Sequence, residues 1–155
     1  MKRFLIVALS TVFVFAACSK KDVKEGDRDK TAISYDATGS DAGKAGDMKT
    51  AHFDFDKFNI TAEAKSILEA NAKWLKSNPK VHVQIEGHCD SRGSIEYNLA
   101  LGEKRAIATK KYLVMLGIKA NRLNTISYGK ERPLDADDSE SAWAKNRRAN
   151  FVIVK

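Results

Sequence analysis

The sequence predicts an α/β sandwich, in which helices cover one face of a mixed β-sheet. Three observations support this fold class: two segments with helical hydrophobic periodicity, short segments in which apolar and polar residues alternate, and the order in which they follow one another. From residue 51 onward that order is strand, helix, strand, helix, strand, strand, which corresponds to a βαβαββ domain. Residues 51–155 suffice for one hydrophobic core, and no internal repeat indicates a second domain.

The chain begins with the pattern of a secretory signal. Lys2 and Arg3 precede an apolar run over residues 4–15, which is too short to span a bilayer as a mature helix. We therefore expect residues 1–17 to be a signal peptide. Small residues stand directly before Cys18, which resembles the lipobox of bacterial lipoproteins, where the cysteine becomes the lipidated first residue of the mature chain. The alternative is an ordinary signal peptide followed by an unmodified cysteine.

Residues 18–50 are predicted to form a lipidated N-terminus and a flexible tether. They are rich in Lys, Asp, Gly, Ser and Ala and show no sustained hydrophobic period. Such a segment buries too little apolar surface to offset the entropy of ordering. Roughly 30 residues of random coil span about 30 Å, so the tether would separate the folded domain from its anchor.

The first strand and helix of the domain follow from two patterns. Ala51, Phe53 and Phe55 alternate with polar residues, which is typical of a half-buried strand. Thr61 is a candidate N-cap for a helix over about 62–76, because a threonine hydroxyl can accept a hydrogen bond from the first helical turn. Residues 78–79, Asn-Pro, end that helix. Its expected buried stripe consists of Ala64, Ile67, Leu68, Asn71, Trp74 and Leu75.

The remaining elements continue the alternation. A second strand over 81–86 leads into a loop over 87–93, and a helix over about 95–116 follows, with Gly117 as its C-cap. Strands are expected at 123–128 and 148–154, with a short helical turn around Trp143 between them. The expected core contacts of the long helix are Leu99, Ala106, Ile107, Leu113 and Leu116.

Charge and cysteine content exclude several classes of protein. Without residues 1–17 the chain carries 25 basic and 20 acidic side chains, and the two signs are interspersed. Together with the export signal, this disfavours a nucleic-acid partner. If Cys18 carries lipid, Cys89 has no partner for a disulfide within the chain, and no CxxC spacing indicates a metal site. We therefore expect neither a metal nor a cofactor.

The loop over 87–93 and the helix after it carry the most informative side chains. Asp90 lies in the loop and Arg105 on the helix. A carboxylate and a guanidinium held apart suit a ligand that carries both an ammonium and a carboxylate, because charge-assisted hydrogen bonds are strong and Arg can hold a carboxylate bidentately. The structural alternatives are a loop-capping role for Asp90 and a solvated helix face for Arg105.

The adjacent His88, Cys89 and Asp90 also raise the possibility of a Cys-dependent hydrolase. Neighbouring residues in a strand point to opposite faces, which is poor geometry for a nucleophile and its base. We therefore expect no catalytic residue, with Cys89 as a small semi-buried residue and His88 as a hydrogen-bonded structural one.

Five motifs resemble the OmpA-like C-terminal domain family, in its order and with its spacings. They are FDFDK at 53–57, EGHCDSRG at 86–93, YNLALGEKRA at 97–106, SYGKERP at 127–133 and NRRA at 146–149. The resemblance implies non-covalent binding of peptidoglycan through the diaminopimelate of its stem peptide. Asp90 then matches the residue that receives the diaminopimelate ammonium, and Arg105 matches the one that holds its carboxylate.

The resemblance also implies roles for further residues. Phe55, Asp56 and Leu101 match positions that border the family's pocket, Arg92 contributes to its rim, and Asn98 fastens the loop to the helix. One residue of the Arg147-Arg148 pair is expected to pair with an acid and to hold the closing loop.

For the whole chain, the resemblance implies an outer-membrane lipoprotein that faces the periplasm and ties the membrane to the wall. Ser19 after Cys18 resembles outer-membrane sorting. The implied partners are peptidoglycan, the outer membrane through acyl chains such as palmitate on Cys18, and the Tol proteins, TolB among them, in envelope constriction at cell division. A Tol-independent wall-binding lipoprotein is the first alternative, and a Cys89-dependent wall hydrolase is the second.

Overall fold

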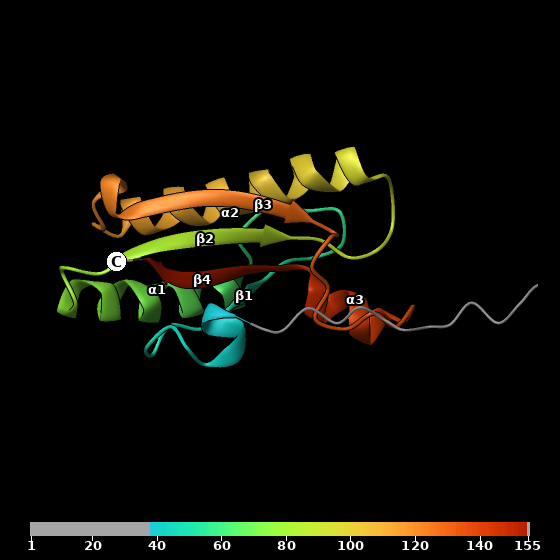
Figure 1. Cartoon of the computed structure of the whole chain (residues 1–155). Helices are drawn as coiled ribbons and strands as arrows, with labels where there is room; N and C mark the ends of the chain where they lie inside the picture. The colour runs from blue at the N-terminus through green and yellow to red at the C-terminus, as the bar shows by residue number, and fades with distance from the viewer. Residues whose placement is uncertain (1–37, 155) are drawn as a thin grey trace, which may run out of the picture. The chain divides into compact units, whose positions relative to one another are not determined.

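A computed structural model describes residues 38–154, so the predicted signal peptide and Cys18 lie outside the described residues. This part of the chain forms a four-stranded sheet in the order β1-β4-β2-β3 with helices packed against it (Figure 1). Among the described residues, no helix is both long and apolar enough to cross a membrane. The elements in chain order are η1 (Gly39–Ala42), β1 (Ala51–His52), α1 (Ala62–Ser77), β2 (His82–His88), α2 (Ile95–Met115), η2 (Ala120–Arg122), β3 (Leu123–Gly129), α3 (Glu140–Asn146) and β4 (Arg148–Val154).

The sheet is mixed, as predicted. β2 lies at its centre, parallel to β3 and antiparallel to β4, while β1 pairs antiparallel with β4. α2 connects the two parallel strands. Side chains of α1 and α2 meet one face of the sheet in a core that includes Leu68, Leu75, Ile85, Leu113 and Phe151, all without measurable solvent exposure. The predicted α/β sandwich is thereby confirmed.

Local sequence signals explain where the helices begin and end. The hydroxyl of Thr61 accepts a hydrogen bond from the backbone N–H of Ala64 at 3.1 Å, so the predicted N-cap of α1 is confirmed. Ser94 caps α2 in the same way. At its other end Gly117 has a φ of 94°, which a glycine adopts readily, and Ile118 N–H donates back to Leu113 O.

A pair of glycines brings α2 unusually close to β2. A Cβ added to Gly87 would lie 1.8 Å from the carbonyl oxygen of Gly102, which leaves no room for any side chain at residue 87. Gly87 stands near the end of β2, directly before the Asp90 loop, and Gly102 lies one helical turn before Arg105. The contact therefore places Arg105 beside that loop.

The folded part begins earlier than predicted, because residues 38–50 pack on the domain instead of forming a tether. Ala45 and Met48 are buried, and the Asn71 side chain exchanges hydrogen bonds with the backbone of Lys49. Asn71 lies on the buried stripe of α1, and its amide side chain pairs with both the N–H and the C=O of Lys49. An apolar side chain at this position could not form these bonds. The predicted boundary at residue 50 is wrong for residues 38–50, because Ser40, Asp41 and Thr50 form side-chain hydrogen bonds within the fold.

η1 carries the polar side chains that attach this segment to β4. Asp41 Oδ2 accepts a hydrogen bond from Arg148 Nε at 2.7 Å, and Ser40 Oγ donates to Asn150 Oδ1 at 2.9 Å. Asn150 Nδ2 in turn donates to Glu86 Oε2 on β2 at 2.9 Å. We refer to Ser40, Asp41, Glu86, Arg148 and Asn150 as the N-terminal cluster.

Two further predictions about the core were wrong. The first strand ends at His52, and Phe55 lies beyond it in a loop with 53% of its surface exposed. Leu99 is 46% exposed instead of belonging to the core, because it lies one residue away from the buried face of α2 that carries Asn98 and Leu101. An apolar residue in a helix is a weak indicator of burial when the buried face also carries polar side chains.

Candidate binding pocket

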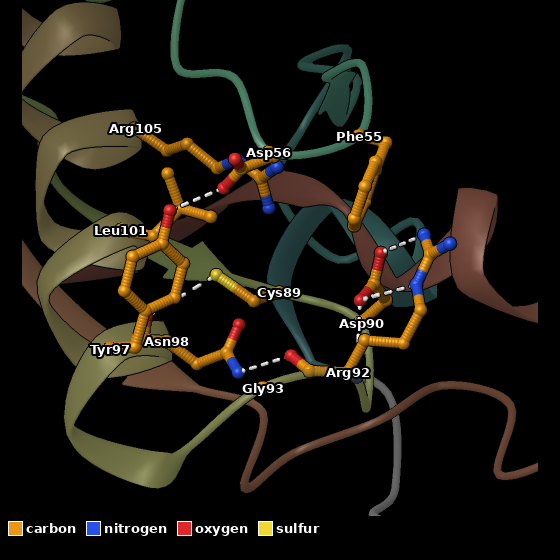
Figure 2. Close-up of a pocket in the computed structure, with 10 residues that line it drawn as sticks. All are labelled: Phe55, Asp56, Cys89, Asp90, Arg92, Gly93, Tyr97, Asn98, Leu101 and Arg105. Carbon is orange, nitrogen blue, oxygen red and sulfur yellow. Dashed lines mark hydrogen bonds and ion pairs between the residues drawn. The ribbon is translucent and has the colours of Figure 1, made fainter.

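A pocket of about 200 Å³ opens between the loop after β1, the loop after β2 and the first turns of α2 (Figure 2). All seven residues predicted for ligand binding in the folded domain line it. These seven are Phe55, Asp56, Asp90, Arg92, Asn98, Leu101 and Arg105. Three further residues, Cys89, Gly93 and Tyr97, complete the lining. Residues up to 50 positions apart in the sequence thus meet at one site.

α2 contributes one wall of the pocket through a single face. Tyr97, Leu101 and Arg105 are spaced by four residues, so their side chains project from the same side of the helix. This spacing was visible in the sequence and would have identified Tyr97, which the sequence analysis missed.

Arg105 is buried, with 1% of its surface exposed, so the alternative of a solvated helix face is excluded. Its Nε donates to Lys57 O at 2.9 Å, Nη1 to His88 O at 2.8 Å and Nη2 to Asp54 O at 3.1 Å. These three bonds tie the loop after β1 to β2. Within residues 38–154, no carboxylate forms an ion pair with Arg105. Burial accordingly lowers the pKa of its guanidinium.

The carboxylate of Asp90 is also buried, and it is already paired. Oδ1 accepts hydrogen bonds from the backbone N–H and Nε of Arg92, and Oδ2 accepts from Arg92 Nη2 at 2.7 Å and Arg147 Nη1 at 3.4 Å. Burial alone would raise the pKa of Asp90, but the hydrogen bonds from Arg92 outweigh it and hold the pKa below its ordinary value. The bond to the backbone of Arg92 also gives Asp90 the loop-capping geometry considered above.

Arg92 forms part of the rim, where its guanidinium lies between two aromatic rings. Its Cζ atom is 3.8 Å from the ring centroid of Phe55 and 4.0 Å from that of Trp143. This arrangement suits cation–π attraction on both faces of the guanidinium. Trp143 does not line the pocket, but it contacts the rim residue Arg92, and sequence reasoning missed this contact because its helix follows the loop by about 50 residues.

The loop after β1 closes the other side of the pocket. Asp56 has a φ of 55°, a left-handed conformation that Asp tolerates better than most residues. Its carboxylate accepts a hydrogen bond from the Tyr97 hydroxyl, which joins the loop to α2 (Figure 2). Asn98 Nδ2 donates to the carbonyls of Arg92 and Ser94 and thereby fastens the other loop to the helix, as predicted.

Cys89 and His88 do not form a catalytic pair. Burial raises the pKa of the Cys89 thiol to about 11, so the thiol is protonated at neutral pH, and Sγ donates to Asn98 O. The His88 ring stacks on Tyr128 instead. The predicted hydrogen bonding of His88 is not found among residues 38–154: neither ring nitrogen has a hydrogen-bond partner there, and the carboxylate of Glu86 is 3.6 Å from Nε2.

Both arginines at the start of β4 pair with acids, although only one was expected to do so. Arg147 contacts Asp90 and Glu140, and its Nε donates to Phe53 O. Arg148 pairs with Asp41 in the N-terminal cluster. Arg147 does not itself line the pocket, but it pairs with the pocket residue Asp90, a contact that the sequence analysis did not predict. In the part of the chain that the structure describes, no three His, Cys, Asp or Glu side chains lie close enough together to hold a metal ion.

Comparison with known proteins identifies the class of protein that this fold and pocket define. The model of the OmpA family matches residues 52–147. The chain therefore belongs to the OmpA family. The matched region contains every residue that lines the pocket.

Within that family the chain is similar to peptidoglycan-associated lipoproteins. It is 40% identical to the one of Rhizobium meliloti (strain 1021), over 96% of this chain and 86% of that protein. It is 48% identical to the one of Brucella melitensis biotype 1, over 65% of this chain and 60% of that protein. The crystal structure of the peptidoglycan-associated lipoprotein from Burkholderia pseudomallei is similar with a TM-score of 0.65 and 41% identity, over 68% of this chain and 89% of that one.

Proposed function

We propose that this chain binds peptidoglycan non-covalently, through the diaminopimelate residue of the stem peptide. The observation that carries the proposal is the environment of Arg105, a buried cation whose three hydrogen-bond partners are all neutral backbone carbonyls. An unpaired buried charge is unfavourable, and a ligand carboxylate in the pocket would supply the missing counter-charge. Two of the five N–H donors of the guanidinium remain for it.

Asp90 lines the same pocket and is the candidate partner for the ligand's ammonium. A ligand with an ammonium and a carboxylate on one carbon, as at the end of the diaminopimelate side chain, matches this pair of opposite charges. The names of the similar lipoproteins point to the same polymer. Phe55, Asp56 and Leu101 line the same pocket, and the apolar side chains of Phe55 and Leu101 would border the aliphatic part of the ligand.

The cellular part of the proposal rests on the residues before the domain. A lipid on Cys18 would anchor the chain in the outer membrane with the domain in the periplasm, and residues 19–37 would connect the two. Engagement of Tol proteins, TolB among them, during envelope constriction completes the proposed role. A binding assay with purified TolB separates this role from the Tol-independent alternative, because only the former requires a complex.

Co-sedimentation with purified peptidoglycan tests the pocket. Asp90→Asn removes the carboxylate charge without changing its shape, and Arg105→Lys keeps the charge but loses the planar fork. Each should weaken binding by about 2–5 kcal/mol, enough to leave the protein in the supernatant. Asp137→Asn, which alters an exposed carboxylate outside the pocket, is the matched control. Unchanged sedimentation of both pocket variants would refute the proposed site.

Membrane fractionation tests the anchor. Cys18→Ala should release the protein from the membrane fraction while its binding to isolated peptidoglycan is retained, because the lipidated cysteine lies outside the folded domain. If the variant still pellets with membranes, lipid on Cys18 is not the main attachment.

A further inference from the structure

The carboxylate of Asp90 has no acceptor capacity left for a ligand. Its two oxygens offer about four lone-pair sites, and the structure fills four: two on Oδ1 by Arg92, one on Oδ2 by Arg92 and one on Oδ2 by Arg147. An ammonium that binds Asp90 must therefore replace one of these donors. The ligand that the pocket prefers therefore depends on whether Arg92 or Arg147 is the donor that is replaced.

Arg147 is held too firmly to be the donor that leaves. It is 7% exposed, its Nε donates to Phe53 O at 3.0 Å, and its Nη2 lies 2.8 Å from Glu140 Oε1. The Arg92 side chain is 31% exposed and its guanidinium has no backbone carbonyl as a partner among the described residues. Its side chain is therefore the movable partner of Asp90.

The loop does not depend on the Arg92 guanidinium for its shape. Asn98 Nδ2 donates to the carbonyl of Arg92 itself at 2.7 Å. Lys130 Nζ donates to the carbonyls of Ser91 and Gly93 on either side. The Arg92 side chain can leave Asp90 while these bonds hold the backbone in place.

The charges around Asp90 favour a particular ligand. Arg92 and Arg147 both pair with Asp90, and Arg105 adds a third cation in the same pocket. Other carboxylates nearby include Glu140, which contacts Arg92 and Arg147, and Asp56, which lines the pocket and accepts from Tyr97. A ligand that brings only an ammonium adds another positive charge and takes Arg92 from Asp90 at 2.7 Å, leaving it the longer contact of Nη1 with Glu140 Oε2 at 3.8 Å. A ligand that also brings a carboxylate offers the displaced guanidinium a new partner.

We propose that Arg92 determines the specificity of the pocket, as a resident cation that a ligand's ammonium displaces from Asp90 and that then pairs with the same ligand's carboxylate. This inference rests on the proposed function. It predicts that the pocket disfavours a stem peptide with lysine in place of diaminopimelate for two reasons: Arg105 lacks a carboxylate to hold, and Arg92 is displaced without compensation.

Calorimetric titration of the full chain, carrying Cys18→Ala so that no lipid is attached, tests the inference. The two probes are a stem peptide with diaminopimelate and the same peptide with lysine. Arg92→Gln should bind the lysine peptide about tenfold more tightly than the parent does, because the competing cation is gone. Its affinity for the diaminopimelate peptide should change less, since loss of the competitor and loss of the new ion pair oppose each other. The preference for diaminopimelate therefore falls.

Two controls isolate the role of Arg92. Arg132→Gln removes the same charge from an exposed arginine that stacks on Tyr128 outside the pocket, and it should leave both affinities unchanged. In the Asp90→Asn background, Arg92→Gln should no longer improve binding of the lysine peptide, because there is no carboxylate left to compete for. Thermal unfolding of each variant verifies the fold.

The possible outcomes are distinct. No gain in lysine-peptide affinity in Arg92→Gln would overturn the inference, and so would an equal weakening for both peptides, which would make Arg92 a support for Asp90. In both cases diaminopimelate binding by the parent chain would leave the proposed function standing. If the parent chain does not bind the diaminopimelate peptide, the proposed function and this inference both fail.

Discussion

Arg147, the C-cap of α3, and Arg148, the first residue of β4, are neighbours in the sequence, yet their side chains join two different groups of charged residues. Arg148 belongs to the N-terminal cluster, where it pairs with Asp41 and both side chains are at least 97% buried. Arg147 belongs to the group that lines or adjoins the pocket, which we call the pocket cluster and define as Asp90, Arg92, Arg105 and Arg147. There Arg105 is buried and has no carboxylate partner within the described residues, while Arg92 pairs with Asp90 but is partly exposed.

The difference separates a structural ion pair from a binding site. In the N-terminal cluster the buried cation has its anion, and Ser40, Asn150 and Glu86 are joined by hydrogen bonds around them. Such a cluster holds the fold together and has nothing to offer a ligand. In the pocket cluster, Arg105 lies beside a cavity and forms no ion pair with a carboxylate of residues 38–154, which is the arrangement expected of a site completed by an anionic group.

Removing Asp41 should have the largest effect on stability. Asp41→Ala leaves Arg148 buried without an anion, so the free energy of unfolding should fall by about 3–5 kcal/mol, measured by urea denaturation. Peptidoglycan binding by the folded fraction should remain, because neither Asp41 nor Arg148 lines the pocket. Asp47→Ala, at an exposed position in the same segment, should cost far less. A loss below about 1 kcal/mol for Asp41→Ala would contradict a structural role for the cluster.

Removing the charge of Asp90 should have a smaller effect on stability. In Asp90→Asn, Arg147 keeps Glu140 and Phe53 O as partners and Arg92 can turn to solvent. We expect the free energy of unfolding to fall by about 1–2 kcal/mol, by the same urea denaturation, although peptidoglycan binding is lost. Equal losses of stability for the Asp41 and Asp90 variants would remove the distinction between the two clusters.

The pH dependence of stability should reveal His88, which adjoins the N-terminal cluster. Burial lowers the pKa of His88 below its usual 6.5, and Arg148 also lowers it while Glu86 and Asp41 act in the opposite direction. The unfolded chain then binds more protons, so stability falls as the pH drops below about 6.5 towards the folded-state pKa, by at most about 1.4 kcal/mol per pH unit.

His88→Asn should flatten that slope between pH 6.5 and 5, as measured by denaturation at several pH values. Burial also lowers the pKa of His52, so the double variant with His52→Asn should be flatter still. An unchanged slope in both variants would assign the acid sensitivity to other groups.

Much of the site could be predicted from the sequence because its parts are local. Asp90 follows a strand and Arg105 lies on the next helix, and the spacing of Tyr97, Leu101 and Arg105 places them on one helix face. The partners of these residues could not be predicted in the same way. Arg147 contacts Asp90 across 57 positions of the sequence, and the Arg92 guanidinium stacks on the ring of Trp143 in α3. No local sequence pattern connects α3 to the loop after β2.

The sequence by itself determined the order of strands and helices, the N-cap of α1, the glycine that ends α2 and the positions of Asp90 and Arg105, because periodicity, capping and turn chemistry act over a few residues. Only the tertiary structure decided that residues 38–50 join the fold and that Asp90 is already paired. Both depend on contacts between distant segments, such as Asp41 with Arg148 across 107 positions. The free energy of a polar residue depends on whether such a partner is present, and composition alone does not specify one.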